Sequence, residues 1–393
     1  MYESLKTPFT PPASLEEIQQ HVETYFDVVS SSTEVHGSIP IYLYRIEKEV
    51  HTKQPFKRLL ADVREKDYTV FLQKGDTSEY LRIIAVPSIR QPRSVIRGQK
   101  EAVNDVKERM IGEKEKRKEA GDQLPTWTIV SLLLTLVTIT FAGYLLTSAF
   151  GEFSTIPLIL TIFFYVLSLF SIILFHELGH MIASKMHGIE TTYPIFLPGL
   201  PTIGGSFGAY IREKEPPVNR DELLDIGLMG PVFGFIVAMI VTVVGILLSK
   251  PNSNGNSLSS LPLPLLYQYL SQVLRPATGN LNYHPIAFAG WVGFLITGLN
   301  LLPASQLDGG HVSRALFKGK IHRILTYVII GILLLVGLYL MAFLLFFITR
   351  GRHPPPLDDV SPLTTKRKIF AVLSWLLVVL TFPPLQFSTL STF

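Results

Sequence analysis

Two histidines and a glutamate stand at the end of a long apolar run, in the order His-Glu-Leu-Gly-His. Residues 156–175, which precede them, carry no charge, and about 20 apolar residues suffice for a helix to cross a bilayer. On such a helix His176 and His180 share one face. Two neutral imidazoles at this spacing can bind one Zn²⁺, and Glu177 beside them can take a proton from water. The motif therefore predicts metal-assisted hydrolysis at membrane depth.

A His-Glu-x-x-His motif alone is moderately specific, since a chain with this histidine content contains one by chance in roughly one case in a hundred. The position of this motif at the end of an apolar run makes a functional role more plausible. A charged side chain at mid-helix costs about 2.5–3.5 kcal/mol on insertion scales, so intramembrane ionisable groups are functional candidates. The alternative, that His176 and Glu177 lie in a wet interface without a role, is the weaker interpretation.

A third ligand is expected, because catalytic zinc takes three protein ligands and leaves a position for water. A second polar stretch follows the apolar residues 286–299, beginning at Asn300 and including Asp308. Two histidines and one carboxylate form a known catalytic zinc set, and Gly309 and Gly310 let the backbone approach closely. Asp-Gly alone is typical of an ordinary turn. Together with the histidines it favours Asp308 as the third ligand of one Zn²⁺ per chain.

The composition is that of a membrane protein joined to a soluble part. The chain has 393 residues, of which 17% are charged, and its mean hydropathy is +0.34. It contains no cysteine, which excludes disulfides and thiolate zinc sites. The net charge of +4 is modest for this length. No basic block with interleaved aromatic residues suggests a nucleic-acid partner.

Residues 1–97 are expected to form a small soluble α/β domain. Ser14, followed three positions later by Glu17, predicts a helix start with a capping box. A second helix is expected over residues 56–63, and strands over residues 40–46, 68–72 and 80–86. No catalytic constellation occurs in this part, which is interpreted as regulatory or substrate-selecting. Residues 98–125 carry many charges of both signs and are expected to form a solvated linker.

Residues 126–393 are expected to form a transmembrane metalloprotease domain, so the predicted fold class is mainly α: a polytopic helical membrane protein with a small soluble domain. About six spans are predicted from apolar length. They cover roughly residues 127–150, 156–185, 223–249, 285–303, 321–348 and 369–383.

Charge sets the expected orientation of these spans. The lysines and arginines of the linker lie just before the first span, and the positive-inside rule keeps such residues in the cytoplasm. The N-terminal domain is therefore expected to be cytoplasmic. The second and fourth spans then both end on the cytoplasmic side, which brings His176, His180 and Asp308 to one depth. The basic loop at residues 350–368 does not fit the positive-inside rule, because the five predicted spans before it place this loop outside the cytoplasm.

Four motifs in a fixed order resemble those of the site-2 protease family of intramembrane zinc metalloproteases. The chain looks most like prokaryotic and plastid-type members with an N-terminal extension, and no PDZ-like domain is inserted between Lys185 and Leu223. The matching motifs are His-Glu-Leu-Gly-His at 176–180, Gly-Gly-Ser-Phe-Gly-Ala at 204–209, Gly-Pro-Val-Phe-Gly-Phe at 230–235, and Asn-Leu-Leu-Pro at 300–303 with Leu-Asp-Gly-Gly at 307–310.

The resemblance implies roles for individual residues. The zinc ligands of the family fall on His176, His180 and Asp308, its catalytic glutamate on Glu177 and its polar asparagine on Asn300. It also implies an endopeptidase that cuts transmembrane protein substrates within or near their membrane segments. A multi-pass protein of a prokaryotic cell membrane is expected, with a plastid membrane as the alternative. Lipid is the surrounding partner, and the oligomeric state stays open.

The segment 197–211 is too apolar for a free loop, and its prolines and glycines forbid a long helix. Lipid-exposed irregular backbone is not tolerated, so the segment must fold against the protein or line a wet cavity. Residues 206–211 can be extended, and an exposed edge there could pair with an unwound substrate strand. We expect substrate contacts from Gly205, Ser206, Phe207, Gly208 and Ala209. The rival interpretation is a packing loop that seals the site.

Two other classes of function compete with the enzyme. A metal transporter or zinc-sensing membrane protein could use the same histidines and aspartate, but transport commonly uses inverted repeats. No such repeat is visible, and transport gives Glu177 no required role. A degenerate protease acting as a scaffold is disfavoured, because each expected catalytic residue is present. Small residues at 227, 230 and 234 are interpreted as helix packing only.

Overall fold

The structure is a computed structural model that divides into two compact units. The first unit consists of Met1–Gln123, Pro217–Arg220 and Pro355–Pro362, and the second of Leu124–Pro216, Asp221–Pro354 and Leu363–Phe393. The described residues are 13–36, 39–48, 51–75, 77, 79–88, 125–149, 157–251, 262–276, 281–349 and 353–383. The linker predicted over residues 98–125 lies outside them, apart from its last residue.

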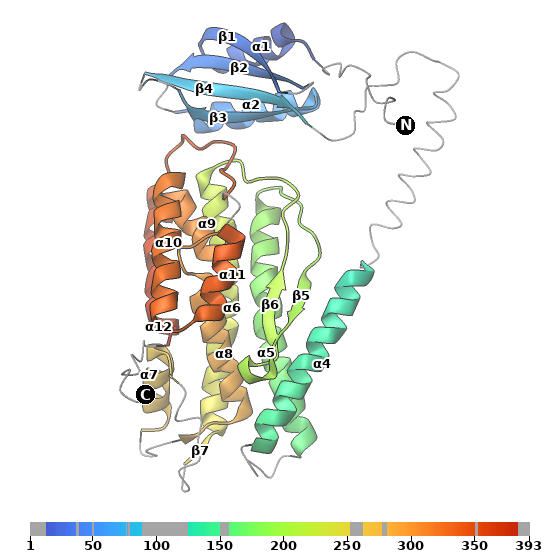
Figure 1. The fold of residues 1–393 in the computed structure, drawn as a ribbon, viewed down its shortest axis with the longest axis vertical. Helices are drawn as coiled ribbons and strands as arrows, with labels where there is room; N and C mark the ends of the chain where they lie inside the picture. The colour runs from blue at the N-terminus through green and yellow to red at the C-terminus, as the bar shows by residue number, and fades with distance from the viewer. Residues whose placement is uncertain are drawn as a thin grey trace, which may run out of the picture. The chain divides into compact units, whose positions relative to one another are not determined.

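The first unit is a four-stranded antiparallel sheet with two helices, which confirms the predicted small α/β domain (Figure 1). The strand order is β1-β2-β4-β3. Ser14 caps the first helix, since its hydroxyl oxygen accepts a hydrogen bond of 3.2 Å from the Glu17 amide. The elements are α1 (Leu15–Glu23), β1 (Val28–His36), β2 (Ile39–Glu47), α2 (Lys53–Glu65), β3 (Tyr68–Lys74) and β4 (Tyr80–Pro87).

One face of this sheet carries the core of the unit. Burial alternates along β3 and β4 as a half-buried strand requires. The rings of Tyr42 and Tyr68 stack with centroids 5.6 Å apart. Both of their hydroxyls donate to the Ala13 carbonyl at 3.1 Å. The buried phenols therefore keep hydrogen-bond partners, as buried polar groups must.

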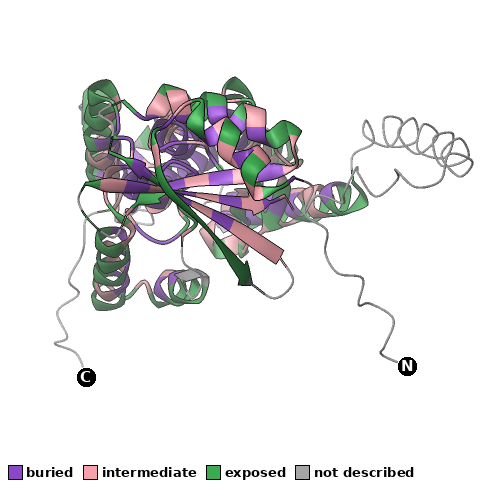
Figure 2. Ribbon diagram, turned by 90° about the horizontal axis from the view of Figure 1, so that it is seen from above, coloured by how far each residue is buried: buried purple, intermediate pink, exposed green. Residues whose placement is uncertain are grey.

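The strand β1 was not among the predicted elements. Its sequence contains three consecutive serines, and clusters of serine are typical of loops. Pairing with β2 along residues 28–36 makes it a strand all the same. Its side chains at 29–35 are exposed, and Figure 2 shows the strand green along most of its length.

Two short segments from far along the chain complete the first unit, and the sequence prediction did not include them. The Leu72 amide in β3 donates to the Leu357 carbonyl at 2.8 Å, and the Asp359 amide donates back to the Leu72 carbonyl at 3.2 Å. The Leu357 amide in turn donates to the Pro217 carbonyl at 3.0 Å. Leu357 is fully buried in the core of this unit. Residues 357–359 thus pair with the β3 edge of the sheet, and residues 217–219 pair with them in turn.

The second unit is helical. Three of its described helices are long and apolar enough to cross a membrane, namely α4, α5 and α6, and α8 is a shorter apolar helix. Its helices are α4 (Thr126–Ala149), α5 (Leu158–Met186), α6 (Arg220–Leu248), α7 (Leu265–Leu274), α8 (Pro285–Asn300), α9 (Asp308–Leu316), α10 (Gly319–Leu335), α11 (Tyr339–Thr349) and α12 (Thr365–Thr381). Its strands are β5 (Ile195–Pro198), β6 (Ser206–Tyr210), β7 (Lys250–Pro251) and β8 (Leu281–Asn282). A short 3-10 helix, η1 (Pro201–Ile203), lies between β5 and β6.

The single span predicted over residues 321–348 is instead the pair α10 and α11. The chain turns at Gly337, which has a φ of +84°, a value that suits glycine because it has no Cβ. The Leu338 amide closes the turn by donating to the Leu333 carbonyl at 2.9 Å. Side chains of both helices share one small core, with Ile330 and Leu333 against Ala342 and Leu345. A hairpin returns the chain to the side it left, so the basic loop 350–368 no longer conflicts with the positive-inside rule.

Candidate metal centre

The helix α5 supplies the two histidines. Its regular geometry places His176 and His180 one above the other, with ring centroids 4.9 Å apart. Both side chains are buried. Their Nε2 atoms lie 3.2 Å apart, so the two imidazoles converge on one point, as predicted from their spacing.

Asp308 reaches the same point from the start of α9. One of its carboxylate oxygens lies 3.0 Å from His176 Nε2, and the other lies 3.3 Å from His180 Nε2. The ligand atoms of the three residues all lie within 4.8 Å of one another, and no other such group occurs among the described residues. Residues 132 positions apart in the chain thus form the cluster that the sequence predicted.

The spacing of these atoms fits a tetrahedral metal site. Ligand atoms at about 2.0–2.2 Å from a tetrahedral Zn²⁺ lie roughly 3.3 Å from one another. The three observed separations of 3.0, 3.2 and 3.3 Å agree with that value. Two imidazole nitrogens and a carboxylate are also a donor set that zinc takes in catalytic sites. The residues present therefore fit one zinc ion.

The backbone of α6 fixes the orientation of His180. The distance from His180 Nδ1 to the Ile226 carbonyl oxygen is 2.7 Å. A carbonyl oxygen can only accept, so Nδ1 carries the proton and donates it. In the neutral ring Nε2 then holds the lone pair, which points toward His176 and Asp308. This is the arrangement by which an outer contact prepares a histidine for a metal.

Glycines on α6 make room for both rings. A Cβ at Gly230 would overlap the His180 ring, and a Cβ at Gly234 would lie 3.1 Å from His176 Nδ1. On α5 itself, a Cβ at Gly179 would overlap the Met229 carbonyl. The sequence predicts that the small residues of α6 serve helix packing only. The structure specifies the surface they pack against, which is the pair of site histidines.

Glu177 and Asn300 complete the centre. Glu177 lies beside His176 on α5, and its side chain is buried. Asn300 is the last residue of α8, and its Nδ2 lies 3.4 Å from His176 Nε2. The predicted catalytic residues therefore lie on two helices that meet at the cluster.

The predicted extended segment forms the strand β6. It pairs antiparallel with β5, with Phe196 opposite Ala209 and Leu197 opposite Gly208. Ser206 and Gly208 are buried, whereas Phe207 is 50% exposed. Gly205 and Gly208 have φ values of +87° and +98°, which side chains with a Cβ rarely adopt. The Thr138 hydroxyl of α4 donates to the Gly205 carbonyl at 2.6 Å, which fastens this strand to the neighbouring helix.

Three further histidines, for which the sequence predicts no role, lie close together in the second unit. His311 Nδ1 lies 3.1 Å from His353 Nε2, and His322 Nδ1 lies 2.7 Å from the Ser313 hydroxyl. Burial lowers the pKa of His353 to about 2 and keeps its ring neutral. A signal was present in the sequence, because His311 follows Asp308 by three positions and so shares its helix face.

Comparison with known proteins shows which family this region resembles. Residues 164–344 match the model of Peptidase family M50. The chain is 33% identical over 229 residues to the Arabidopsis thaliana protein described as probable zinc metalloprotease EGY1, chloroplastic, a match that covers 54% of this chain and 41% of the relative. It is 30% identical over 227 residues to probable zinc metalloprotease EGY2 of the same plant, covering 54% and 40%. Probable zinc metallopeptidase EGY3 is 26% identical over 242 residues, covering 55% and 42%.

No solved structure matches the chain significantly. The chain spans about two fifths of the length of the curated relatives it matches, with 41% and 40% of the first two covered. The matched residues include all three members of the cluster and Glu177. The region around the metal centre, residues 164–344, therefore resembles peptidase family M50, the site-2 protease family.

Proposed function

We propose that this chain is an intramembrane zinc endopeptidase, which hydrolyses peptide bonds within or near the transmembrane segments of other membrane proteins. The observation that carries the proposal is the convergence of His176, His180 and Asp308 beside Glu177, on helices of a membrane-spanning unit. The names of the relatives, which describe zinc metalloproteases, support it. No observation favours the transporter or zinc sensor.

His176 Nε2, His180 Nε2 and the Asp308 carboxylate would hold the zinc ion, one per chain. When bound, zinc lowers the pKa of a coordinated water to about 7 and polarises a carbonyl group. The hydrogen bond to Ile226 holds His180 in the required tautomer. The Asp308 carboxylate would balance part of the positive charge of the ion. The protein therefore presents a preformed set of donors and need not rearrange to bind the ion.

Glu177 is the proposed general base. Its burial removes competing water, and its place next to His176 puts it beside the cluster. In this role the carboxylate takes a proton from the attacking water and passes it to the leaving amine, which balances the hydrolysis. The Asn300 amide, 3.4 Å from His176 Nε2, is the proposed donor to the oxyanion that develops on the substrate carbonyl.

A transmembrane helix buries its own peptide groups, so a substrate must unwind before a carbonyl can reach the centre. We propose that residues 205–209 hold the unwound strand. One edge of β6 pairs with β5, and among the described residues no strand pairs with its other edge. Strand addition there would satisfy backbone groups that the substrate helix has released. The alternative is that β6 only seals the site.

The conformation of Gly208 decides how this substrate strand can be tested. Its φ of +98° conflicts with proline and strains alanine, so neither substitution separates strand pairing from local damage. A better test uses Phe207→Cys, because the chain contains no cysteine and this side chain is 50% exposed. In a Glu177→Gln background it should crosslink to a single-cysteine substrate near the cut site. Met186→Cys is the control, at a 72% exposed position at the end of α5, and it should not crosslink to the substrate.

We infer the orientation of the chain in the membrane from its charged residues, and its location from the relatives. The multi-pass character is supported by the apolar helices, and we propose that the N-terminal part lies on the cytoplasmic or stromal side. The segments 217–220 and 355–362 join the first unit, so all of them share that side. The division into a domain over 1–97, a linker over 98–125 and a membrane domain over 126–393 stays a prediction, to which these two segments are added.

The decisive experiment is proteolysis by the purified protein in liposomes. A substrate with one transmembrane segment should be cut, cleavage should stop with a zinc chelator, and added Zn²⁺ should restore it. Glu177→Gln protein serves as the control for contaminating proteases. Cleavage that persists with the chelator, or equally with Glu177→Gln, would contradict the proposed enzyme.

A further inference from the structure

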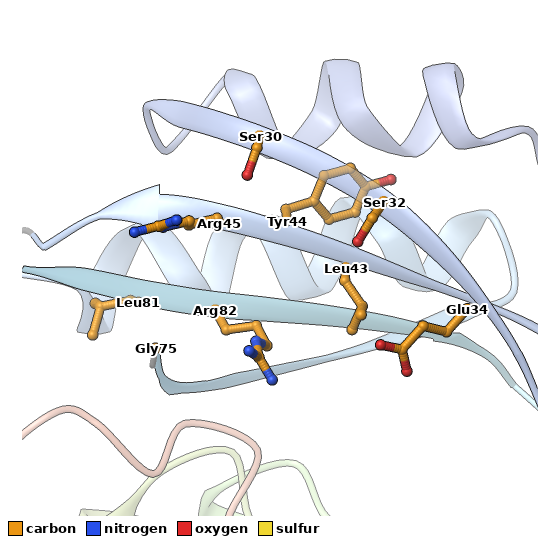
Figure 3. A pocket seen from close by; sticks show the side chains of 9 residues that line it. All are labelled: Ser30, Ser32, Glu34, Leu43, Tyr44, Arg45, Gly75, Leu81 and Arg82. Carbon is orange, nitrogen blue, oxygen red and sulfur yellow. The ribbon is translucent and has the colours of Figure 1, made fainter. Parts of the chain in front are cut away.

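A hollow of about 260 Å³ lies along β1, β2 and β4 of the first unit (Figure 3). Of the two arginines that line it, Arg45 is stacked on the Tyr80 ring, 3.8 Å from the centroid, and Arg82 also has a partner. The hollow therefore offers no unpaired cation to a ligand. The polar side chains that bear on the metal centre lie in the second unit, on α10.

The segment 301–307 joins α8 to α9 and leads directly into Asp308, the first residue of α9. Its side chains at 301, 302, 304 and 305 are buried. The segment is a run of turns and bends rather than a helix or strand. Contacts from neighbouring elements are therefore needed to fix the position of the Asp308 carboxylate.

Ser305, three residues before Asp308, has a strained backbone. Its φ is +51°, in the left-handed region that residues with a Cβ adopt reluctantly. Such conformations persist where the surrounding structure holds them, and they are common at functional sites. The Ser305 hydroxyl has no hydrogen-bond partner among the described residues. The side chain of Ser305 therefore does not stabilise this conformation itself.

The backbone amide of Ser305 is held by α10. It donates to the Thr326 hydroxyl oxygen at 2.9 Å, and the same hydroxyl donates to the His322 carbonyl at 3.0 Å. A hydroxyl has one proton to give, so toward Ser305 it can only accept. Thr326 is 1% exposed, and water does not compete for this bond. The contact is therefore a directed one, from the segment to the helix.

The same face of α10 makes a second contact, beyond Asp308 in the chain. α10 lies next to α9 (Figure 1), and His322 Nδ1 lies 2.7 Å from the Ser313 hydroxyl of α9. His322 and Thr326 are four residues apart, so they share one face of their helix. Their contacts reach the chain on both sides of Asp308, at positions 305 and 313.

The segment is also packed tightly between the two helices. A Cβ at Gly310 of α9 would overlap the Ser305 carbonyl, and Ala304 shares a buried apolar core with Ile330 of α10. A rotation of the Ser305 peptide would therefore press on the first turn of α9, which carries Asp308.

We propose that α10 positions the zinc ligand Asp308, with Thr326 as the positioning residue. Its hydroxyl holds Ser305 in the left-handed conformation, and this conformation sets where α9 begins. The proposal rests on the proposed function, since it takes Asp308 to bind zinc. Without the Thr326 hydroxyl, the buried Ser305 amide loses its partner. The Ser305 backbone then relaxes toward negative φ, and the carboxylate leaves its place beside the two histidines.

Thr326→Val in the full chain tests this role, because valine keeps the shape of the side chain and removes the hydroxyl. Zinc affinity, measured by competition with a chromophoric chelator, should fall by about 10-fold, as for other losses of outer support to a metal ligand. Thr326→Ser keeps the hydroxyl and should bind zinc as the natural chain does. Thr147→Val is the matched control, since Thr147 is also buried and donates to the Gly143 carbonyl of its own helix. Equal affinities of Thr326→Val and Thr147→Val would overturn the proposal.

A second substitution tests the route through the Ser305 backbone. Ser305→Gly, added to Thr326→Val, should recover part of the zinc affinity, because glycine adopts a positive φ without the penalty of a Cβ. Ser305→Ala keeps the Cβ and should recover nothing. General damage to α10 would respond to neither substitution. Equal affinities of the two double variants would therefore overturn the role of the left-handed conformation.

Hydrogen exchange of the metal-free chain separates this proposal from the proposed function. The peptide that contains Ser305 should exchange faster in Thr326→Val than in the natural chain or in Thr147→Val, because its amide has lost an acceptor. This result depends neither on zinc nor on cleavage. A natural chain that binds no zinc would overturn the proposed function together with this role of Asp308. Unchanged exchange in Thr326→Val would overturn the hold of α10 on the segment alone.

Discussion

The two units differ in how they bury polar and charged groups, as a comparison of the metal centre with the sheet shows. At the metal centre, ionisable side chains from α5 and α9 are buried together, and neighbours in the same unit fix their directions. In the first unit, the hydroxyls of Tyr42 and Tyr68 share one backbone carbonyl, and Asp358 is the one carboxylate buried among the described residues of this unit, where its Oδ1 accepts from the Val360 and Ser361 amides. Burying charge is costly unless it is paired. The metal centre gathers several ionisable side chains at one point, whereas the first unit buries a single described carboxylate, which accepts hydrogen bonds from neighbouring backbone amides.

Because of this difference, mutations in the two units should have different effects on activity and on stability. Changes at the centre should remove activity or metal with little effect on folding, whereas changes in the sheet should alter stability and leave chemistry intact. The five experiments that follow can break or sharpen that distinction.

The largest effect is expected from Asp308→Ala. It should remove most bound zinc and abolish cleavage, because two histidines alone hold zinc poorly and the ion needs three protein ligands here. Metal analysis of the purified protein measures the first effect and a cleavage assay the second. Glu190→Ala is the control, since that carboxylate is exposed in a salt bridge with Lys214 and such pairs contribute little. Full zinc occupancy in Asp308→Ala protein would remove Asp308 from the ligand set.

Glu177→Gln should separate binding from chemistry. The amide keeps the shape of the side chain and cannot act as a base, so zinc content should be unchanged while turnover falls by about 10²–10⁴. Single-turnover cleavage and metal analysis on the same preparation provide both values. Near-normal cleavage would contradict the proposed mechanism, and loss of zinc would show that Glu177 supports the ligands instead.

Asn300→Leu should also retain zinc and should lower kcat by about 10²–10³, the effect of losing one oxyanion donor. KM should change little, because the interaction forms in the transition state. Asn300→Asp is a useful companion, since it keeps the size and loses the amide donor. A rise in KM at constant kcat would assign Asn300 to substrate binding.

Gly230→Ala should weaken metal binding through packing alone. The added methyl overlaps the His180 ring and must displace it from its contact with Ile226. Losses of outer support of this kind lower metal affinity by about 10–100-fold. Gly331→Ala is the matched control, because a Cβ there meets nothing within 4 Å. Competition with a chromophoric chelator measures the affinities, and equal values for the two variants would refute the role of Gly230.

Much of the centre was predictable, because its signals are local. The i to i+4 spacing fixes the faces of His176 and His180, and an apolar run fixes their depth. Asp308 could be predicted as the third ligand because it is a carboxylate in a polar stretch that follows a second apolar segment. The contact between Gly230 and His180 could not be predicted in this way, since it depends on the packing of two helices that the sequence does not align.

The errors also have physical causes. Hydropathy alone predicted one span over residues 321–348, because the turn at Gly337 lies between apolar residues and changes no average. β1 was missed because its serines resemble a loop and it becomes a strand only by pairing. The insertion of residues 355–362 beside β3 is a long-range contact of 285 positions, from Leu72 to Leu357, and no local pattern encodes it.

The smallest effect is expected in the sheet unit, from Ser14→Ala. The Ser14 hydroxyl accepts the Glu17 amide at the start of α1, and removing such a cap costs about 1 kcal/mol. Ser14→Asp, which keeps an acceptor, should restore the stability and is the control for the substitution itself. Denaturant unfolding followed by circular dichroism measures the change, while kcat and zinc content should stay at the values of the natural chain. If the small loss of stability lowered kcat as well, the soluble unit would be coupled to the metal centre, and the division of roles drawn between the two units would be wrong.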